Sequence, residues 1–207
     1  VILNPTPAEV RAFRAARRRH IRHEAELAVY RSLPARTRDG VEVRLLANIE
    51  FVEEVPAALA HGAEGIGLYR TEFLYLNRRD LPGEEEQVRA YGAILEKLAP
   101  RPVTIRTLDL GGDRLPPGVS RREGNPALGL RGIRWCLGHP DVFRLQLRAL
   151  WRASTRGNLR VMFPLVSGLG ELRAARERLA RAREEVVREG YPVAERVPVG
   201  IMVEMPS

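Results

Sequence analysis

The sequence predicts an α/β protein, and within that class a partial TIM (β/α)8 barrel preceded by a helical linker. Short apolar runs alternate with helical segments along the chain, which is the pattern of β/α units around a parallel sheet. The runs have few polar residues, as is typical of strands that are buried on both faces. Charged or amide side chains stand where successive runs end, and a TIM barrel places its active site there. Five runs are present in the 207 residues, so we expect about five of the eight β/α units of a barrel.

Residues 6–33 predict one long, polar helix. Thr6 suits the N-cap, Pro7 suits the first turn, and Glu9 supplies a negative charge near the amino terminus of the helix. The helix carries a thin apolar set, consisting of Val10, Phe13, Ile21 and Leu27. Such a set is too small for a core helix, so we expect a connector on or between other domains. We therefore assign residues 1–40 to a helical linker.

Residues 41–207 contain the repeated strand and helix pattern. The predicted strands are 43–49, 65–69, 103–108, 159–166 and 197–203. The predicted helices are 51–61, 84–98, a pair around 131–137 and 142–153, and 171–189. Right-handed crossovers leave a doubly wound sheet or a TIM barrel. The first strand leads into Asn48-Ile49-Glu50-Phe51 rather than a glycine-rich dinucleotide fingerprint, which favours the barrel. We expect 41–207 to be the first part of a barrel that is truncated at the C-terminus.

Composition excludes several classes of protein. The net charge is +8, but six of these charges lie in residues 1–38, and aromatic residues make up only 6%. A nucleic-acid surface would interleave basic and aromatic groups, so we expect a solvated helix and no nucleic-acid partner. The single cysteine, Cys136, excludes an internal disulfide framework. Because no apolar run approaches about 20 residues, we expect a cytoplasmic protein without a membrane partner.

Three arginines stand near strand ends or in apolar surroundings, at Arg70, Arg106 and Arg131. A buried, unpaired charge loses several kcal/mol of solvation, so each arginine requires an anionic partner. One possibility is an internal ion pair with Glu72 or Asp109. The other is an anionic ligand, because guanidinium groups bind phosphate and carboxylate in a bidentate manner.

Glu204 follows the fifth apolar run. Its carboxylate suits either a ligand of Mg²⁺ or Mn²⁺ or the partner of an arginine. The segment Gly111-Gly112-Asp113 after the third run either cradles an anion or turns the chain. The four histidines suit surface or capping positions, and Cys136 suits a small core residue. Spacing supports no catalytic triad.

Six segments of the sequence together resemble one known family. They are Gly-Leu-Tyr-Arg-Thr-Glu-Phe-Leu-Tyr (67–75), Leu-Pro-Gly-Glu-Glu-Glu-Gln (81–87), Ile-Arg-Thr-Leu-Asp-Leu-Gly-Gly-Asp (105–113), Asn-Pro-Ala-Leu-Gly-Leu-Arg (125–131), Val-Met-Phe-Pro-Leu (161–165) and Gly-Ile-Met-Val-Glu-Met-Pro (200–206). These segments resemble enzyme I of the phosphoenolpyruvate-dependent sugar phosphotransferase system. They occur in the family's order, and the resemblance extends over essentially the whole chain.

The resemblance implies that Arg70 and Arg106 bind phosphoenolpyruvate, that Arg131 is a third anion contact, and that Glu204 is a ligand of the catalytic Mg²⁺. The family's second metal carboxylate, a further substrate arginine and the proton-donating cysteine would lie beyond Ser207. We therefore expect no catalytic residue within this chain. The domain that carries the phosphorylated histidine and the docking site for the histidine phosphocarrier protein (HPr) would precede the chain.

The implied activity is that of a phosphoenolpyruvate-protein phosphotransferase. Such an enzyme phosphorylates its own histidine, releases pyruvate, and feeds HPr for sugar uptake. The resemblance further implies a homodimer and an inactive fragment when the 207 residues stand alone. Two alternatives stay open: the barrel of a pyruvate phosphate dikinase or phosphoenolpyruvate synthase, and a non-catalytic anion-binding module.

Overall fold

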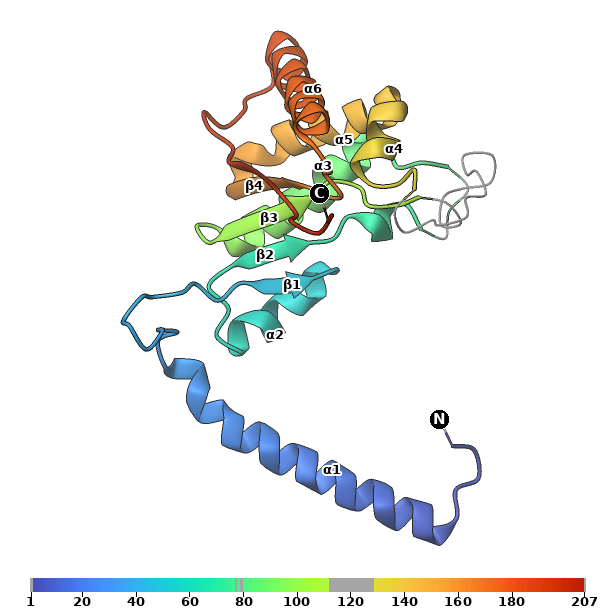
Figure 1. Ribbon diagram of the computed structural model, residues 1–207, viewed down its shortest axis with the longest axis vertical. Helices are drawn as coiled ribbons and strands as arrows, with labels where there is room; N and C mark the ends of the chain where they lie inside the picture. The colour runs from blue at the N-terminus through green and yellow to red at the C-terminus, as the bar shows by residue number, and fades with distance from the viewer. Residues whose placement is uncertain (1, 77, 79, 112–128, 207) are drawn as a thin grey trace.

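The computed structural model describes residues 2–76, 78, 80–111 and 129–206 (Figure 1). Its first element is the long helix α1 (Pro7–Leu27), followed by the 3-10 helix η1 (Ala28–Ser32). Thr6 caps α1: its Oγ1 accepts from the Glu9 N–H at 3.3 Å, and its own N–H donates to Glu9 Oε2 at 2.8 Å. None of the residues of α1 is buried, and the helix extends away from the α/β part of the chain (Figure 1). The expected solvated, polar helix is confirmed.

The α/β part is built on one parallel sheet. Its strands are β1 (Ala47–Ile49), β2 (Ile66–Tyr69), β3 (Pro102–Arg106), β4 (Asn158–Phe163) and β5 (Val199–Ile201). Their spatial order, β1-β2-β3-β4-β5, is also their order along the chain. All five carboxyl ends therefore meet at one edge of the sheet. A doubly wound sheet reverses its strand order, whereas this order is compatible with part of a barrel.

The helices between the strands cover one face of the sheet. They are α2 (Val55–Ala60), α3 (Glu84–Leu98), α4 (Ile133–Gly138), α5 (Pro140–Ala153) and α6 (Leu169–Arg188). Short 3-10 turns lie at η2 (Val52–Glu54), η3 (Glu72–Leu74) and η5 (Ser154–Arg156). Helix α5 packs between α3 and α6, and α3 packs against β3.

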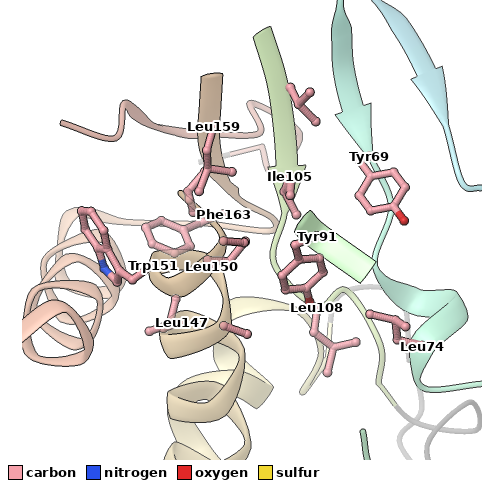
Figure 2. Packing of buried hydrophobic residues seen from close by; sticks show 14 of the residues in the cluster. Tyr69, Leu74, Tyr91, Ile105, Leu108, Leu147, Leu150, Trp151, Leu159 and Phe163 are labelled. Carbon is pink, nitrogen blue, oxygen red and sulfur yellow. The ribbon is translucent and has the colours of Figure 1, made fainter. Parts of the chain in front are cut away.

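Side chains alternate between the two faces of the central strands. Val103 and Ile105 of β3 are fully buried beneath the helices, whereas Thr104 between them is only half-buried. Figure 2 shows the core that results, with Ile105 and Phe163 from the sheet and Tyr91, Leu147 and Trp151 from α3 and α5. The face opposite the helices is thus free to present Arg106 at its carboxyl edge.

The edge strands correct one expectation. We expected all five strands to be buried on both faces, but Val199 and Ile201 of β5 are 38% and 37% exposed, and β1 is only partly buried. Both strands are edges of the sheet, with a neighbouring strand on one side only. Among the described residues, no helix is long and apolar enough to cross a membrane.

An ion-pair network joins α3, α5 and the segment that follows α6. Arg148 of α5 has a side chain that is only 6% exposed, and it contacts Glu84 of α3 at 2.6 Å and Glu189, which follows α6, at 2.5 Å. Arg152, one helical turn later, contacts Glu84 at 2.8 Å. Because these charges come from separate helices, they fix how α3, α5 and α6 sit against one another.

Candidate anion-binding site

Arg106, the last residue of β3, is the centre of the candidate site. Its side chain is 11% exposed. Nη2 donates to Glu72 Oε1 at 3.1 Å, and Nη1 lies 3.1 Å from Asp109 Oδ2 and 3.4 Å from the sulfur of Met202. The guanidinium group therefore touches residues that follow β2, β3 and β5, so it gathers three strand ends around one cation.

Asp109 joins a second arginine to this centre. Nε and Nη2 of Arg131 each lie 3.1 Å from Asp109 Oδ1. The Asp109 N–H donates to Glu72 Oε1 at 2.9 Å, which fixes the backbone that carries the carboxylate. Burial raises the pKa of Asp109 above its usual value, and Arg106 and Arg131 oppose that rise. The carboxylate is thus costly to bury and is placed where it meets two guanidinium groups.

The ion-pair interpretation from the sequence is correct for two arginines. Arg106 pairs with both Glu72 and Asp109, and Arg131 pairs with Asp109. These pairs leave donor capacity, since each guanidinium has five N–H groups. Within the described part of the chain, the buried Nε of Arg106 has no hydrogen-bond partner, and Arg131 keeps 30% of its side chain exposed. Two ordered guanidinium groups with unused donors are able to bind an anion.

A close backbone approach sets the position of Arg131. Gly111 forms an isolated antiparallel bridge with Arg131. A Cβ at Gly111 would lie 2.2 Å from the Cβ of Arg131, so only glycine permits this contact. The other two residues of the expected Gly111-Gly112-Asp113 anion cradle lie outside the described residues. For Gly111 itself, the structure shows a bridge to Arg131.

Arg70 stands apart from the two paired arginines. It directly follows β2, its N–H donates to the carbonyl of Ile49 at 3.1 Å, and its side chain is exposed. It shares the carboxyl edge of the sheet with Arg106, but no contact joins the two side chains. The structure therefore brings together Arg106 and Arg131 and leaves Arg70 at the rim.

Glu204 approaches the site from the end of β5. Its exposed side chain accepts a hydrogen bond from the Leu165 N–H, at 2.8 Å to Oε1. Leu165 adopts a positive φ of 54° and packs against Gly132, where an added Cβ would lie 3.0 Å from Leu165 Cδ1 and 3.3 Å from Asp109 Oδ1. Two residues, Leu165 and Gly132, therefore lie between Glu204 and the Asp109 carboxylate. Among the described residues, no group of three or more potential ligands forms a metal cluster.

The remaining candidate groups have structural roles. Cys136 is 1% exposed, and burial raises the pKa of its thiol well above the usual value. His139 stacks on Trp135 with ring centroids 4.1 Å apart. The sequence does not predict the roles of Gln146 and Thr71, which contact the backbone at Leu108 and Arg106. A buried glutamine on a helix resembles a surface one in sequence, so no signal distinguished it.

Comparison with known proteins supplies the family. The family described as "PEP-utilising enzyme, PEP-binding domain" matches residues 24–207. This chain belongs to that family. The match begins within α1 and includes the whole parallel sheet and its helices, so the paired arginines lie inside the phosphoenolpyruvate (PEP)-binding domain that defines the family.

Curated relatives of this PEP-binding domain share one name. A phosphoenolpyruvate-protein phosphotransferase of Bacillus sp. (strain S) and one of Geobacillus stearothermophilus are each 48% identical over 208 aligned residues. One of Staphylococcus epidermidis is 45% identical. Each alignment covers 100% of this chain but 36% of the relative. The chain therefore spans about a third of the length of these relatives, and the resemblance drawn from the sequence is confirmed.

Proposed function

We propose that this chain is the PEP-binding part of a phosphoenolpyruvate-protein phosphotransferase and forms the first five β/α units of a (β/α)8 barrel. The observation that carries the proposal is the pairing of Arg106 and Arg131 through Asp109 at the carboxyl edge of a PEP-binding domain. The strand order supports the barrel, because consecutive parallel neighbours without a reversal close into one when three further units are added. Residues 1–40 serve as its helical linker.

Phosphoenolpyruvate carries a phosphate and a carboxylate, and each is a match for a guanidinium fork. In the proposed complex Arg106 and Arg131 bind the phosphate, and Arg70 reaches it from the rim. Glu72 and Asp109 hold Arg106 before the ligand arrives, so little reorganisation is required on binding. As the phosphorus–oxygen bond to the enol breaks, the phosphoryl group passes to a histidine and the enolate leaves as pyruvate after protonation. The arginines stabilise the charge on the transferring oxygens.

Glu204 supplies one ligand for Mg²⁺ in this proposal. Its Oε1 accepts a hydrogen bond from the Leu165 N–H, and the described residues give its other oxygen no hydrogen bond. Protein sites hold Mg²⁺ through one or two carboxylates together with water and phosphate oxygens, so a single exposed carboxylate at the same edge of the sheet as an anion site fits the ion. When bound, Mg²⁺ would neutralise charge on the phosphate and on the developing enolate.

The partners proposed for the intact protein follow from the family resemblance alone. We propose that the phosphoryl group passes onward to HPr through residues outside this chain, and that the intact protein is a cytoplasmic homodimer. Nucleic acid and membrane are not among the proposed partners. Because 64% of each relative lies outside the aligned segment, we expect the 207 residues alone to bind phosphoenolpyruvate without turnover.

A chimera tests the proposal. This chain replaces the aligned segment of the Geobacillus stearothermophilus relative, and phosphorylation of the chimera by radiolabelled phosphoenolpyruvate is measured. We expect the chimera to be phosphorylated. Arg106→Ala should lower the rate of phosphorylation by several orders of magnitude, because the substitution removes charge stabilisation at the transferring group. Arg156→Ala is the control, since Arg156 forms an exposed pair with Glu96 away from the site. A loss below about tenfold with Arg106→Ala would contradict the assigned role.

Two further measurements separate the alternatives. Consumption of ATP by the intact parent protein would favour a dikinase or synthase, because such a parent also has a nucleotide-binding domain. Equally tight binding of unrelated polyanions, unchanged by Arg70→Ala, would favour a non-catalytic anion-binding module.

A further inference from the structure

A buried glutamine, Gln146, forms hydrogen bonds with residues that support the candidate site. Gln146 projects from α5 and is 1% exposed. Its Oε1 accepts from the Leu108 N–H at 3.0 Å, and its Nε2 donates to the hydroxyls of Thr71 at 3.2 Å and Tyr91 at 3.1 Å. Thr71 in turn donates to the carbonyl of Arg106 at 3.0 Å. Gln146 thus bonds to the backbone on both sides of Thr107, directly at Leu108 and through Thr71 at Arg106.

The direction of each hydrogen bond in the network around Gln146 is fixed. A backbone N–H only donates, so the Leu108 N–H requires the oxygen of the Gln146 amide and turns its NH₂ toward the two hydroxyls. The Thr71 hydroxyl accepts from this NH₂ and must place its own hydrogen on the Arg106 carbonyl, which only accepts. The Tyr91 hydroxyl places its hydrogen on Gln87 Oε1 at 2.9 Å. No second arrangement satisfies all of these groups.

The clamped segment is the one that carries the site. It runs from Arg106 to Asp109, whose side chains form the 3.1 Å pair that meets Glu72 and Arg131. The next residue along α5, Leu147, is fully buried in the apolar core. A leucine in place of Gln146 would leave the Leu108 N–H unpaired, because that N–H is buried beside the core. The amide therefore serves the backbone of the site.

We propose that Gln146 is a positioning residue for anion binding, which acts through Thr71 and Leu108 to hold Arg106 and Asp109 in place. This inference rests on the proposed function. Gln146→Glu is the sharpest variant, because the side chain keeps its shape and its acceptor for the Leu108 N–H. A carboxylate has no NH₂, so the Thr71 hydroxyl must rotate to donate to it and releases the Arg106 carbonyl. Thr71→Val removes the same bond by a milder change.

The test measures binding of phosphoenolpyruvate with Mg²⁺ to the 207-residue chain by calorimetry. We expect the Kd to rise about tenfold or more with Gln146→Glu and with Thr71→Val, because small displacements of a binding group are costly. The variant with both Gln146→Glu and Thr71→Val should bind phosphoenolpyruvate no more weakly than Gln146→Glu alone, since both changes break the same series of hydrogen bonds. Ser154→Ala is the control: Ser154 is also 1% exposed and hydrogen-bonded, but it directly follows the C-terminal end of α5, eight residues beyond Gln146.

A spectroscopic measurement separates positioning from general destabilisation. The nitrogen-15 NMR signal of Arg106 Nε, assigned with Arg106→Lys, shifts with Gln146→Glu and Thr71→Val and stays in place with Ser154→Ala. An unmoved signal, or a Kd change equal to that of Ser154→Ala at matched loss of thermal stability, overturns the role of Gln146 while the proposed function stands. Failure of the unsubstituted chain to bind phosphoenolpyruvate would overturn the role of Gln146 in this chain, and failure of the unsubstituted chimera as well would overturn the proposed function.

Discussion

Asp109 Oδ2 lies 3.1 Å from Nη1 of Arg106, three residues earlier in the chain. The other oxygen of the same carboxylate contacts a second arginine that arrives from a separate segment. One buried carboxylate thus sets the distance between two guanidinium groups that face the carboxyl edge of the sheet. The arginines are ordered by the protein itself, which is the condition for binding an anion without reorganisation.

Substitution of Arg106 by lysine tests whether anion binding requires the planar guanidinium group of arginine or only its positive charge. A lysine ammonium is a compact charge without the planar geometry that lets Arg106 contact both Glu72 and Asp109. We expect Arg106→Lys to lower the free energy of unfolding by about 2 kcal/mol and to weaken phosphoenolpyruvate binding at least tenfold, roughly the value of one bidentate contact. Urea unfolding and calorimetry measure the two effects. Full affinity with lysine would show that charge alone suffices.

The raised pKa of Asp109 predicts the sign of a pH effect on stability. Burial raises this pKa in the folded state above the ordinary value of 3.8. The folded chain therefore holds the proton more tightly than the unfolded chain, so stability from this group is present below pH 3.8 and is lost as the pH rises through the folded pKa. We expect the stability advantage over Asp109→Asn to shrink with rising pH in that window. A growing advantage would mean that Arg106 and Arg131 outweigh burial.

The helix network has the opposite pH dependence. Burial pushes the pKa of Glu84 upward, but hydrogen bonds from Arg148 and Arg152 outweigh it and lower the pKa below 4.5. Arg148→Met leaves Glu84 without one partner, and we expect a loss of about 3 kcal/mol in the free energy of unfolding at neutral pH. The loss should diminish as the pH falls through the lowered pKa, because protonated Glu84 no longer needs the partner. Urea unfolding between pH 3 and pH 7 follows it, and a pH-independent difference would contradict the ion-pair mechanism.

Local signals predicted some elements better than others. The helix expected at 84–98 has these bounds because Gly83 is its N-cap, three glutamates occupy its first turn and its apolar positions recur at helical spacing. The strand expected at 43–49 begins only at Ala47, because Val43 and Leu45 are about half exposed and lie outside the pairing with β2. Apolar character does not make a strand where a pairing partner is missing.

The candidate site was predictable only in its charges. Arg106 and Arg131 were recognisable because a cation in an apolar segment demands a partner. Their ion-pair partner depends on the position of Asp109 after the strand. Gln146 of α5, which lies 38 residues from Leu108 in the sequence, sets that position through its hydrogen bond to the Leu108 N–H. Amino-acid composition does not indicate long-range contacts to backbone groups, so the hydrogen bonds that support the site could be identified only from the structure.

Cys136 is expected to be inert. Its thiol is 1% exposed, lies 3.7 Å from the carbonyl of Leu108, and has a pKa raised by burial. A thiol that stays protonated is a poor nucleophile, so we expect no reaction with a maleimide in the native chain and rapid reaction in 6 M urea. Cys136→Ala should lower the free energy of unfolding by about 1 kcal/mol through lost packing and leave phosphoenolpyruvate binding unchanged. Native-state labelling within minutes would place the thiol in an accessible position.

Deletion of residues 1–40 tests whether the proposed linker folds separately from the α/β part of the chain. No residue of α1 is buried, and Phe13 and Ile21 on its thin apolar side are 69% and 54% exposed. The helix therefore contributes little burial to the core, since stabilisation follows the apolar area removed from water. We expect the deletion to change the free energy of unfolding by less than about 1 kcal/mol and to leave the cooperativity of urea unfolding unchanged. A matched internal change, Leu147→Ala in the buried face of α5, should cost about 3 kcal/mol. If the deletion costs as much as Leu147→Ala, the first 40 residues belong to the same folding unit as the sheet.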